Sequence, residues 1–190
     1  MLKKMGRALM LLLVMTLLTG IAYPLVVTGL SKVIFPKQAE GSLAYKGGQP
    51  IGSVLIGQNF SDVRYFYSRP SAAGKDGYDA ANSSGSNLGP TNQAFLDSVA
   101  KQAEKVRTDN GLASTTPVPG DLITASASGL DPAITPEAAQ IQVARVAKAR
   151  NLSEQKVQAL ADQYTEGRQF GLLGEPRVNV LKLNIALDSL

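Results

Sequence analysis

The sequence has 190 residues, a formal net charge of +4, and neither cysteine nor histidine. This composition excludes a disulfide framework, a cysteine nucleophile, a Ser-His-Asp triad, and any zinc or haem site that depends on histidine or cysteine ligands. All fifteen acidic and sixteen of the nineteen basic residues follow residue 31, so residues 31–190 carry about +1 and show no basic patch for nucleic acid.

Residues 8–30 form an uncharged stretch of 23 residues. A helix rises ~1.5 Å per residue, so this length spans roughly 34 Å, enough to cross a hydrocarbon core of about 30 Å. A single segment in lipid has to be helical, because only a helix satisfies its own backbone hydrogen bonds there. The sequence therefore predicts a tip at residues 1–7, a transmembrane helix at residues 8–30 and one domain at residues 31–190.

Basic residues are concentrated ahead of this stretch. Lys3, Lys4 and Arg7 accompany the chain amine in the first seven residues, whereas the next three lysines are spread over sixteen residues and partly offset by Glu40. The positive-inside bias therefore predicts that the amino terminus lies in the cytoplasm and residues 31–190 lie outside.

A cleaved signal peptide is the alternative reading of the same segment. Gly20 and Ala22 are small residues at the spacing of a processing site before Tyr23. The apolar run continues for eight residues past Ala22, where a mature secreted protein normally becomes polar. We therefore prefer an uncleaved anchor, with a freely secreted binding protein as the alternative.

Small and weakly polar residues recur at steps of four within the apolar stretch. Thr16, Gly20, Pro24 and Thr28 share one helix face. Such residues let membrane helices approach closely and supply side-chain oxygens for bonds between helices, so this stripe is predicted to face partner helices. Pro24 is also predicted to bend the helix near its outer end.

The first part of the outer domain reads as strands followed by a long loop. Two short strands, SLAY and IGSVLI, lie within residues 42–56 and are joined by a turn at residues 46–50. Residues 68–92 are rich in Gly, Ser, Asn, Ala and Pro. A loop that long in a compact domain is usually functional or disordered, and we predict an ordered loop that binds a partner.

The second part is predicted to be mostly helical, with capping residues that mark each start. The helices are predicted at residues 92–108, at residues 135–150 and from residue 153 onward, with caps at Asn92 (or Thr91), Thr135 and Ser153. The alternating sequence VNVLKL predicts a strand at residues 178–183 before a short helical tail. Mixed strands and helices in this order indicate an α+β domain.

No catalytic motif is visible. Gly74-Lys75 is followed by Asp76, so there is no Walker A sequence. The chain also lacks an acidic residue followed by Lys-Thr-Gly-Thr, the motif that forms an aspartyl phosphate. A Ser/Lys dyad needs no histidine, but it requires a buried, neutral lysine beside a serine. The candidate lysines lie in polar or helix-surface contexts: Lys75, Lys101, Lys105, Lys148 and Lys156. We predict no catalytic residue and no metal site, with a membrane-anchored Ser/Lys hydrolase as the alternative function.

Short motifs are distributed over residues 57–179. They are Gly57-Gln58-Asn59-Phe60, Arg69-Pro70-Ser71-Ala72, Gly85-Ser86-Asn87-Leu88-Gly89-Pro90-Thr91-Asn92, Thr124-Ala125-Ser126, Ser128-Gly129-Leu130-Asp131-Pro132, Arg145-Val146-Ala147 with Ala149-Arg150, and Gly174-Glu175-Pro176-Arg177-Val178-Asn179. Through them nearly the whole chain resembles the KdpC family, the C subunit of the bacterial potassium-importing P-type ATPase complex.

The resemblance implies a non-catalytic, single-span accessory subunit in the bacterial inner membrane. Its implied partners are a channel-like potassium-translocating subunit, an ATP-hydrolysing subunit and a small membrane peptide. The family is described as a catalytic chaperone that raises the ATP affinity of the hydrolysing subunit. A domain outside the membrane cannot touch cytoplasmic ATP, so that effect has to be a coupling free energy transmitted through the membrane subunits.

We therefore expect no cofactor on this chain alone, with ATP and potassium acting in the complex. Partner contacts are predicted in the residues of the long loop and the motifs beside it: Gln58, Asn59, Phe60, Arg69, Pro70, Ser86, Asn87, Leu88, Gly89 and Pro90.

Overall fold

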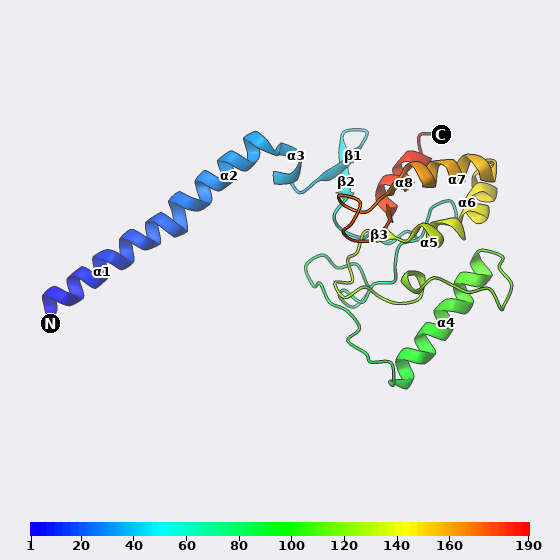
Figure 1. Ribbon diagram of the computed structural model, residues 1–190, viewed down its shortest axis with the longest axis horizontal. Helices are drawn as coiled ribbons and strands as arrows, with labels where there is room; N and C mark the ends of the chain where they lie inside the picture. The colour runs from blue at the N-terminus through cyan, green and yellow to red at the C-terminus, as the bar shows by residue number, and fades with distance from the viewer. The chain divides into compact units, whose positions relative to one another are not determined.

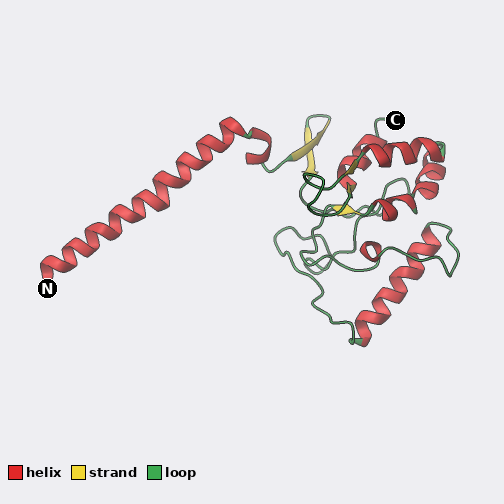
Figure 2. Cartoon of the chain, in the orientation of Figure 1, coloured by secondary structure: helices red, strands yellow, loops and turns green.

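The computed structural model describes residues 1–190, which divide into two compact units, Met1–Ser53 and Val54–Leu190. Figure 1 traces the chain from the amino-terminal helix into the mixed second unit, and Figure 2 shows that helices alternate there with short strands and long loops. The predicted α+β class with one long apolar helix is confirmed.

One long helix dominates the first unit. It comprises α1 (Leu2–Leu17), a π-helical turn (Leu18–Ala22) and α2 (Tyr23–Ile34), and it is long and apolar enough to cross a membrane. The predicted span at residues 8–30 lies inside this helix. The π turn, in which the Tyr23 N–H donates to the Leu18 carbonyl, directly precedes Pro24. Proline has no N–H to donate, so a widened turn at this point has an evident physical cause.

The remainder of the first unit is a short helix, α3 (Pro36–Ala39), and a hairpin of β1 (Leu43–Lys46) and β2 (Gln49–Ser53). The hairpin turn at Gly47 and Gly48 has φ of +58° and +80°, which glycine adopts without steric cost. The second strand was predicted to reach residue 56 but ends at Ser53. Beyond it the Val54 carbonyl and the Gly57 N–H bond to loop and side-chain groups of the second unit, which removes them from strand pairing.

The second unit contains five α-helices, one 3₁₀ helix (Gly120–Leu122) and three short strands. The helices are α4 (Gln93–Asp109), α5 (Pro136–Gln140), α6 (Val143–Arg150), α7 (Glu154–Gln163) and α8 (Val180–Leu187). The strands β3 (Ala133–Ile134), β4 (Thr165–Glu166) and β5 (Arg177–Asn179) form an antiparallel sheet in the order β3-β5-β4.

The predicted helix starts are confirmed by side-chain caps. Asn92, Thr135 and Ser153 each accept a hydrogen bond from the backbone N–H three residues later. The single helix predicted at residues 135–150 is wrong, because it divides into α5 and α6 at Ile141-Gln142. There the side-chain amide of Gln142 donates to the Ala138 carbonyl, while its backbone N–H donates to the Ala139 carbonyl. This interrupts the regular α-helical hydrogen bonds between residues four apart.

The strand predicted at residues 178–183 is also wrong beyond Asn179. The Asn179 side chain accepts from the Lys182 N–H and starts α8. Val180, Leu183 and Leu187 are buried at helical spacing, so the apolar residues that alternate like a strand also fill one helix face. Packing of these side chains in the core therefore favours the helix over the predicted strand.

The core lies among α5, α6, α7, α8 and β5. Val146, Val157, Val178 and Leu183 have no exposed surface there. Phe66, from the segment before the long loop, is equally buried in the same cluster. The segment that leads into the long loop is therefore anchored in the helical core by this aromatic side chain.

Candidate partner-binding surface

Side-chain amides hold the backbone around Phe66. The Phe66 N–H donates to Asn184 Oδ1 at 2.8 Å, and Asn184 Nδ2 donates to the Phe66 carbonyl at 2.9 Å. Gln142 Oε1 accepts from the Tyr67 N–H at 2.7 Å. A buried backbone needs such partners, and here one amide from α8 and one from the turn between α5 and α6 take the place of a neighbouring strand.

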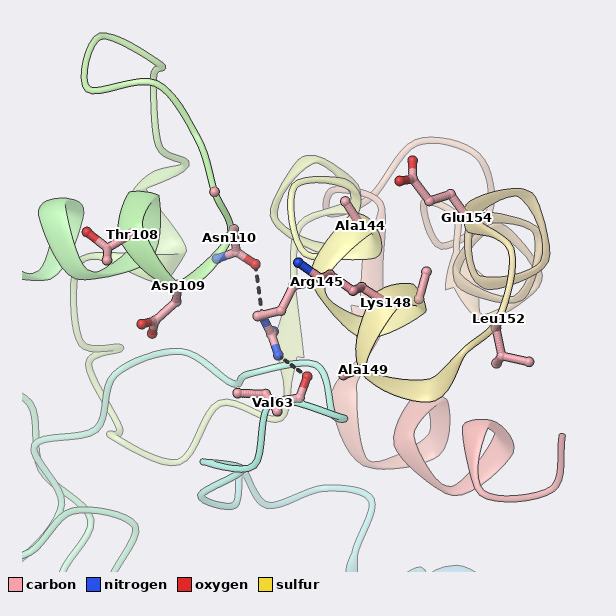
Figure 3. A pocket seen from close by; sticks show the side chains of 12 residues that line it. Val63, Thr108, Asp109, Asn110, Ala144, Arg145, Lys148, Ala149, Leu152 and Glu154 are labelled. Carbon is pink, nitrogen blue, oxygen red and sulfur yellow. Dashed lines mark hydrogen bonds between the residues drawn. The ribbon is translucent and has the colours of Figure 1, made fainter.

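Arg145 is the most enclosed charged residue of this region, with 8% of its surface exposed. Its guanidinium donates to four neutral acceptors: Asn110 Oδ1 at 3.0 Å, the Val63 carbonyl at 2.6 Å, the Tyr65 carbonyl at 3.0 Å and Gln142 Oε1 at 2.8 Å. It also lies over the Tyr67 ring, 3.9 Å from the centroid. Burial lowers the pKa of Arg145, but arginine stays protonated in proteins. Figure 3 shows its bonds to Asn110 and Val63.

Arg150, at the end of α6, completes the arrangement. It donates to the Arg64 carbonyl at 2.7 Å and to Asp188 Oδ1 at 2.8 Å, and it lies 4.8 Å from the centroid of the Tyr65 ring. The Tyr65 hydroxyl bonds to the other oxygen of Asp188 at 3.0 Å. We call Gln142, Arg145, Arg150 and Asn184 the clamp, since together they hold residues 63–67 on the core.

The long loop is fixed by a second set of bonds, to residues 126–131. Ser71 Oγ donates to the Gly129 carbonyl at 2.5 Å and accepts from the backbone N–H groups of Ala73 and Tyr78. Ser83 Oγ donates to the Ser128 carbonyl at 2.9 Å. Gly129, with φ of +67°, lies so close to the loop that a Cβ there would be 2.5 Å from the Ser84 carbonyl oxygen. Sequence motifs far apart in the chain thus meet in one ordered structure.

The predicted contact residues fall into two groups. Asn59, Phe60 and Pro70 help to line a hollow of about 250 Å³, together with Tyr67, Ser68, Tyr78, Gln102 and Lys105 among others. Gln58 acts through its carbonyl, which accepts from Ser68 Oγ at 2.7 Å.

Arg69 lies beside this hollow, in an ion pair with Asp131 at 2.9 Å. Its Nε is buried without a hydrogen-bond partner. The Tyr78 hydroxyl donates to the Arg69 carbonyl at 2.5 Å, and burial raises the pKa of Tyr78 to about 12. The Tyr78 side chain is therefore fixed to the loop backbone by its hydroxyl, and its phenol stays neutral near pH 7.

The second group is an exposed strip that leads into α4. Ser86, Asn87, Leu88, Gly89 and Pro90 are all exposed, and Asn87 adopts a left-handed φ of +53°. None of them lines the hollow beside Phe60. The structure therefore leaves the predicted contacts as two separate surfaces, and partner binding by either one stays a prediction.

A larger cavity of about 880 Å³ lies between the end of α4 and α6 (Figure 3). Its charged lining residues are Asp109, Arg145, Lys148 and Glu154, with Asn110 and Val63 beside them. Sequence reasoning missed this site and the clamp. A signal was present, since Gln142 and Asn184 are polar residues placed among apolar ones, where a buried amide needs a partner.

Residues 1–190 contain no group of three or more His, Asp, Glu or Cys side chains placed to hold a metal ion. The lysines considered for a Ser/Lys dyad are all exposed: Lys75, Lys101, Lys105, Lys148 and Lys156. The membrane stripe of Thr16, Gly20, Pro24 and Thr28 is exposed along the apolar helix, and its contact with partner helices stays a prediction. Nothing in this geometry favours the hydrolase alternative.

The chain matches known proteins over nearly its full length. Residues 5–189 match the family described as KdpC: K+-transporting ATPase, c chain. The chain is 58% identical over 184 residues, 96% of both chains, to the potassium-transporting ATPase KdpC subunit of Methylococcus capsulatus. It is 55% identical over 200 residues to the KdpC subunit of Rhodopseudomonas palustris strain BisB18, covering 100% of this chain and 99% of the other. The KdpC subunit of Dechloromonas aromatica is 56% identical over 185 residues, 96% and 95% of the two chains. The chain therefore belongs to the KdpC family.

Proposed function

We propose that this chain is a non-catalytic accessory subunit that assembles and stabilises a potassium-transporting ATPase complex. Its relatives are named as subunits of such an ATPase, and its one long apolar helix supports association with a membrane. The proposed partners are the potassium-translocating subunit, the ATP-hydrolysing subunit and a small membrane peptide.

The clamp carries this proposal. Arg145, Arg150, Gln142 and Asn184 are polar groups that a catalytic site would need to present to a substrate, yet each bonds to the protein's own backbone or side chains. What they support is the conformation of a surface segment. A protein that uses its buried polar groups in this way presents a shaped surface, which suits binding and not chemistry.

In this proposal ATP and potassium act in the complex, and this chain alone holds neither. Assistance with ATP use, the catalytic-chaperone role, arises as a coupling free energy between assembled states. The hollow beside Phe60 and the strip of residues 86–90 are the proposed partner contacts, with potassium selectivity and hydrolysis left to the other subunits.

A pair of measurements tests the function. The complex purified with and without this subunit is assayed for potassium-stimulated ATPase activity, and calorimetry measures ATP binding to the full chain alone in detergent. We expect activity to be lost without the subunit and no ATP binding at millimolar concentrations. Full activity without the subunit, or tight ATP binding by the lone chain, would overturn the proposal.

The proposed orientation places residues 31–190 outside the cytoplasm. The chain has no cysteine, so single cysteines at Ser86 and at Met5 report on the two sides of the membrane. A membrane-impermeant thiol reagent applied to intact spheroplasts should label the Ser86→Cys chain and spare the Met5→Cys chain. The reverse pattern would contradict the positive-inside argument.

The proposed helix contact is tested at Gly20. Replacing Gly20 with Leu adds a large side chain to the stripe and should weaken co-purification with the membrane subunits, because close helix packing requires small residues. Leu11→Ile, on the opposite side of the helix from Gly20, serves as the control. Equal recovery of the two variants would show that the stripe faces lipid.

A further inference from the structure

The π-helical turn lies at the middle of the uncharged stretch of residues 8–30. Thr19, within this turn, is eleven residues from both Ala8 and Leu30. At a rise of ~1.5 Å per residue it lies about 16 Å from either end, close to the centre of a hydrocarbon core about 30 Å thick. Water does not solvate the backbone at that depth, so each polar backbone group there needs a partner within protein.

Two backbone carbonyls beside the turn lose their helical donors. In a regular α-helix the Thr19 carbonyl would accept from the Tyr23 N–H, but that N–H donates to the Leu18 carbonyl. The residue five positions after Thr19 is Pro24, which has no N–H. The Gly20 carbonyl loses its α-helical donor for the same reason, since that donor would also be Pro24. A π turn thus repairs one bond and leaves these two acceptors without their regular donors.

The nearest hydroxyl of the helix does not replace the missing donors. Thr19 Oγ1 donates to the Met15 carbonyl at 2.7 Å, toward the preceding turn of the helix. This is the usual bond of a threonine within a helix, and it uses the one proton of the hydroxyl. A further donor therefore has to come from outside this helix.

The two carbonyls lie beside the most open part of the helix surface. Thr19, Gly20 and Pro24 are exposed, and a Cβ built on Gly20 would meet no atom within 4 Å. Gly20 and Pro24 are four residues apart and share a face, so the gap left by the missing N–H opens on that face. Small residues let a second helix approach closely enough for its side chains to reach backbone oxygens.

We propose that the Thr19 and Gly20 carbonyls accept hydrogen bonds from a hydroxyl or carboxamide side chain on a transmembrane helix of the potassium-translocating subunit. This inference rests on the proposed function, which supplies that subunit. Lipid tails carry no donor, so lipid cannot satisfy the two carbonyls. Among the proposed partners, the potassium-translocating subunit has to carry polar side chains at the bilayer centre, because these line an ion pathway.

The first test is competition within the assembled complex. Wild-type chain and a Pro24→Ala variant with different tags are co-expressed with the other subunits, and their ratio in the purified complex is measured. Alanine supplies the missing N–H, so the helix can satisfy its own carbonyls and the partner's donor loses its acceptors. We expect incorporation to fall at least ~3-fold, equivalent to ~0.6 kcal/mol for one hydrogen bond between membrane helices.

A rescue variant separates the missing N–H from the shape of the proline ring. Pro24 is replaced by lactic acid, which has the side chain of alanine but an ester oxygen in place of the N–H. Incorporation should recover toward that of the wild type. Loss of incorporation equal to that of Pro24→Ala would overturn the proposal, because the ring and not the free carbonyls would then be required.

Gly29→Ala is the matched control, since Gly29 lies on the opposite side of the helix from Gly20 and also has open space around it. It should incorporate like the wild type. Equal incorporation of the Pro24→Ala and wild-type chains would overturn the inference and leave the proposed function intact. Failure of the wild-type chain itself to incorporate would count against the proposed function, so the two failures are distinguishable.

The second test identifies the helix that supplies the donor. Tyr23, an exposed aromatic residue beside Gly20 and Pro24, is replaced by photoreactive p-benzoylphenylalanine in the full chain, and the illuminated complex is analysed by mass spectrometry. An adduct on the potassium-translocating subunit, within one helical turn of a serine, threonine, asparagine or glutamine, supports the proposal. An adduct only with lipid, with another subunit or with a second copy of this chain would overturn it, and so would the absence of any adduct.

Discussion

Replacing Arg145 with leucine tests whether the clamp stabilises the second unit. The change leaves four acceptors in place, two backbone carbonyls and the side-chain oxygens of Asn110 and Gln142, and removes the donors that satisfy them. A buried acceptor left unpaired costs about 1–3 kcal/mol. Val63 is 54% exposed, so water can replace the guanidinium there, and Gln142 Oε1 keeps its bond from the Tyr67 N–H. The Asn110 side-chain oxygen and the Tyr65 carbonyl are therefore the two acceptors that lose their partner.

Two further effects modify this sum. The stacking of Arg145 on Tyr67 is also lost, at about 1–2 kcal/mol. In the opposite direction, removal of a desolvated cation recovers part of the cost of burying it. The balance is a destabilisation of about 3 kcal/mol, a large fraction of the 5–15 kcal/mol typical of a domain.

Urea unfolding of the full chain in detergent measures this loss, with near-ultraviolet circular dichroism as the probe because Tyr65 and Tyr67 lie in the clamped segment. Lys148→Leu is the control, since Lys148 is exposed on the same helix and its replacement should cost less than ~0.5 kcal/mol. Arg145→Lys should fall between the two. A loss below ~1 kcal/mol for Arg145→Leu would refute the reasoning, because it would mean that the buried acceptors find other partners.

Two predictions concern the rest of the second unit. Gly129→Ala should lower the free energy of unfolding by about 2–4 kcal/mol, because its Cβ would meet the Ser84 carbonyl at 2.5 Å. Gly111→Ala has a similar φ but open space around the new Cβ, so it should cost only ~1 kcal/mol. Urea titrations of the two variants compare these losses, and equal losses would contradict the close approach at Gly129. The hydrogen bond from Lys182 holds the pKa of Glu166 below its ordinary value, so the stability it contributes is present above the unfolded pKa of about 4.3 and is lost as the pH falls through the folded pKa. Urea midpoints at pH 6 and pH 3 should therefore differ less in Glu166→Gln than in the wild type, and an unchanged difference would count against this pair.

Local sequence signals predicted the features that depend on neighbouring residues. The apolar helix follows from the absence of charge over residues 8–30, and three helix starts follow from the caps Asn92, Thr135 and Ser153. Each is a consequence of backbone groups satisfied within a few residues. The wrong predictions arise from contacts between residues far apart in the sequence. Gln142 divides a predicted helix while it bonds to Tyr67, 75 residues away, and no local pattern reports that contact.

The candidate site divides in the same way. The sequence indicated the long loop at residues 68–92, because its composition of Gly, Ser, Asn, Ala and Pro stands out. It did not indicate that Arg145 and Arg150 are structural. The motif Arg145-Val146-Ala147 with Ala149-Arg150 predicts nothing about burial until α6 and the segment around Tyr65 are placed together. The polar residues of a motif thus need tertiary contacts before a role can be assigned.

A subunit without chemistry of its own can change the activity of its complex only by binding two states of that complex unequally. A tenfold shift in such an equilibrium requires about 1.4 kcal/mol of differential affinity. Burial of one Phe or Leu side chain contributes about 1.5–3 kcal/mol, so a single apolar contact made in one state and lost in the other is sufficient. The bonds that hold residues 63–67 on the core matter for the same reason. A flexible surface would follow its partner through both states and bind them alike, whereas a fixed surface discriminates between them.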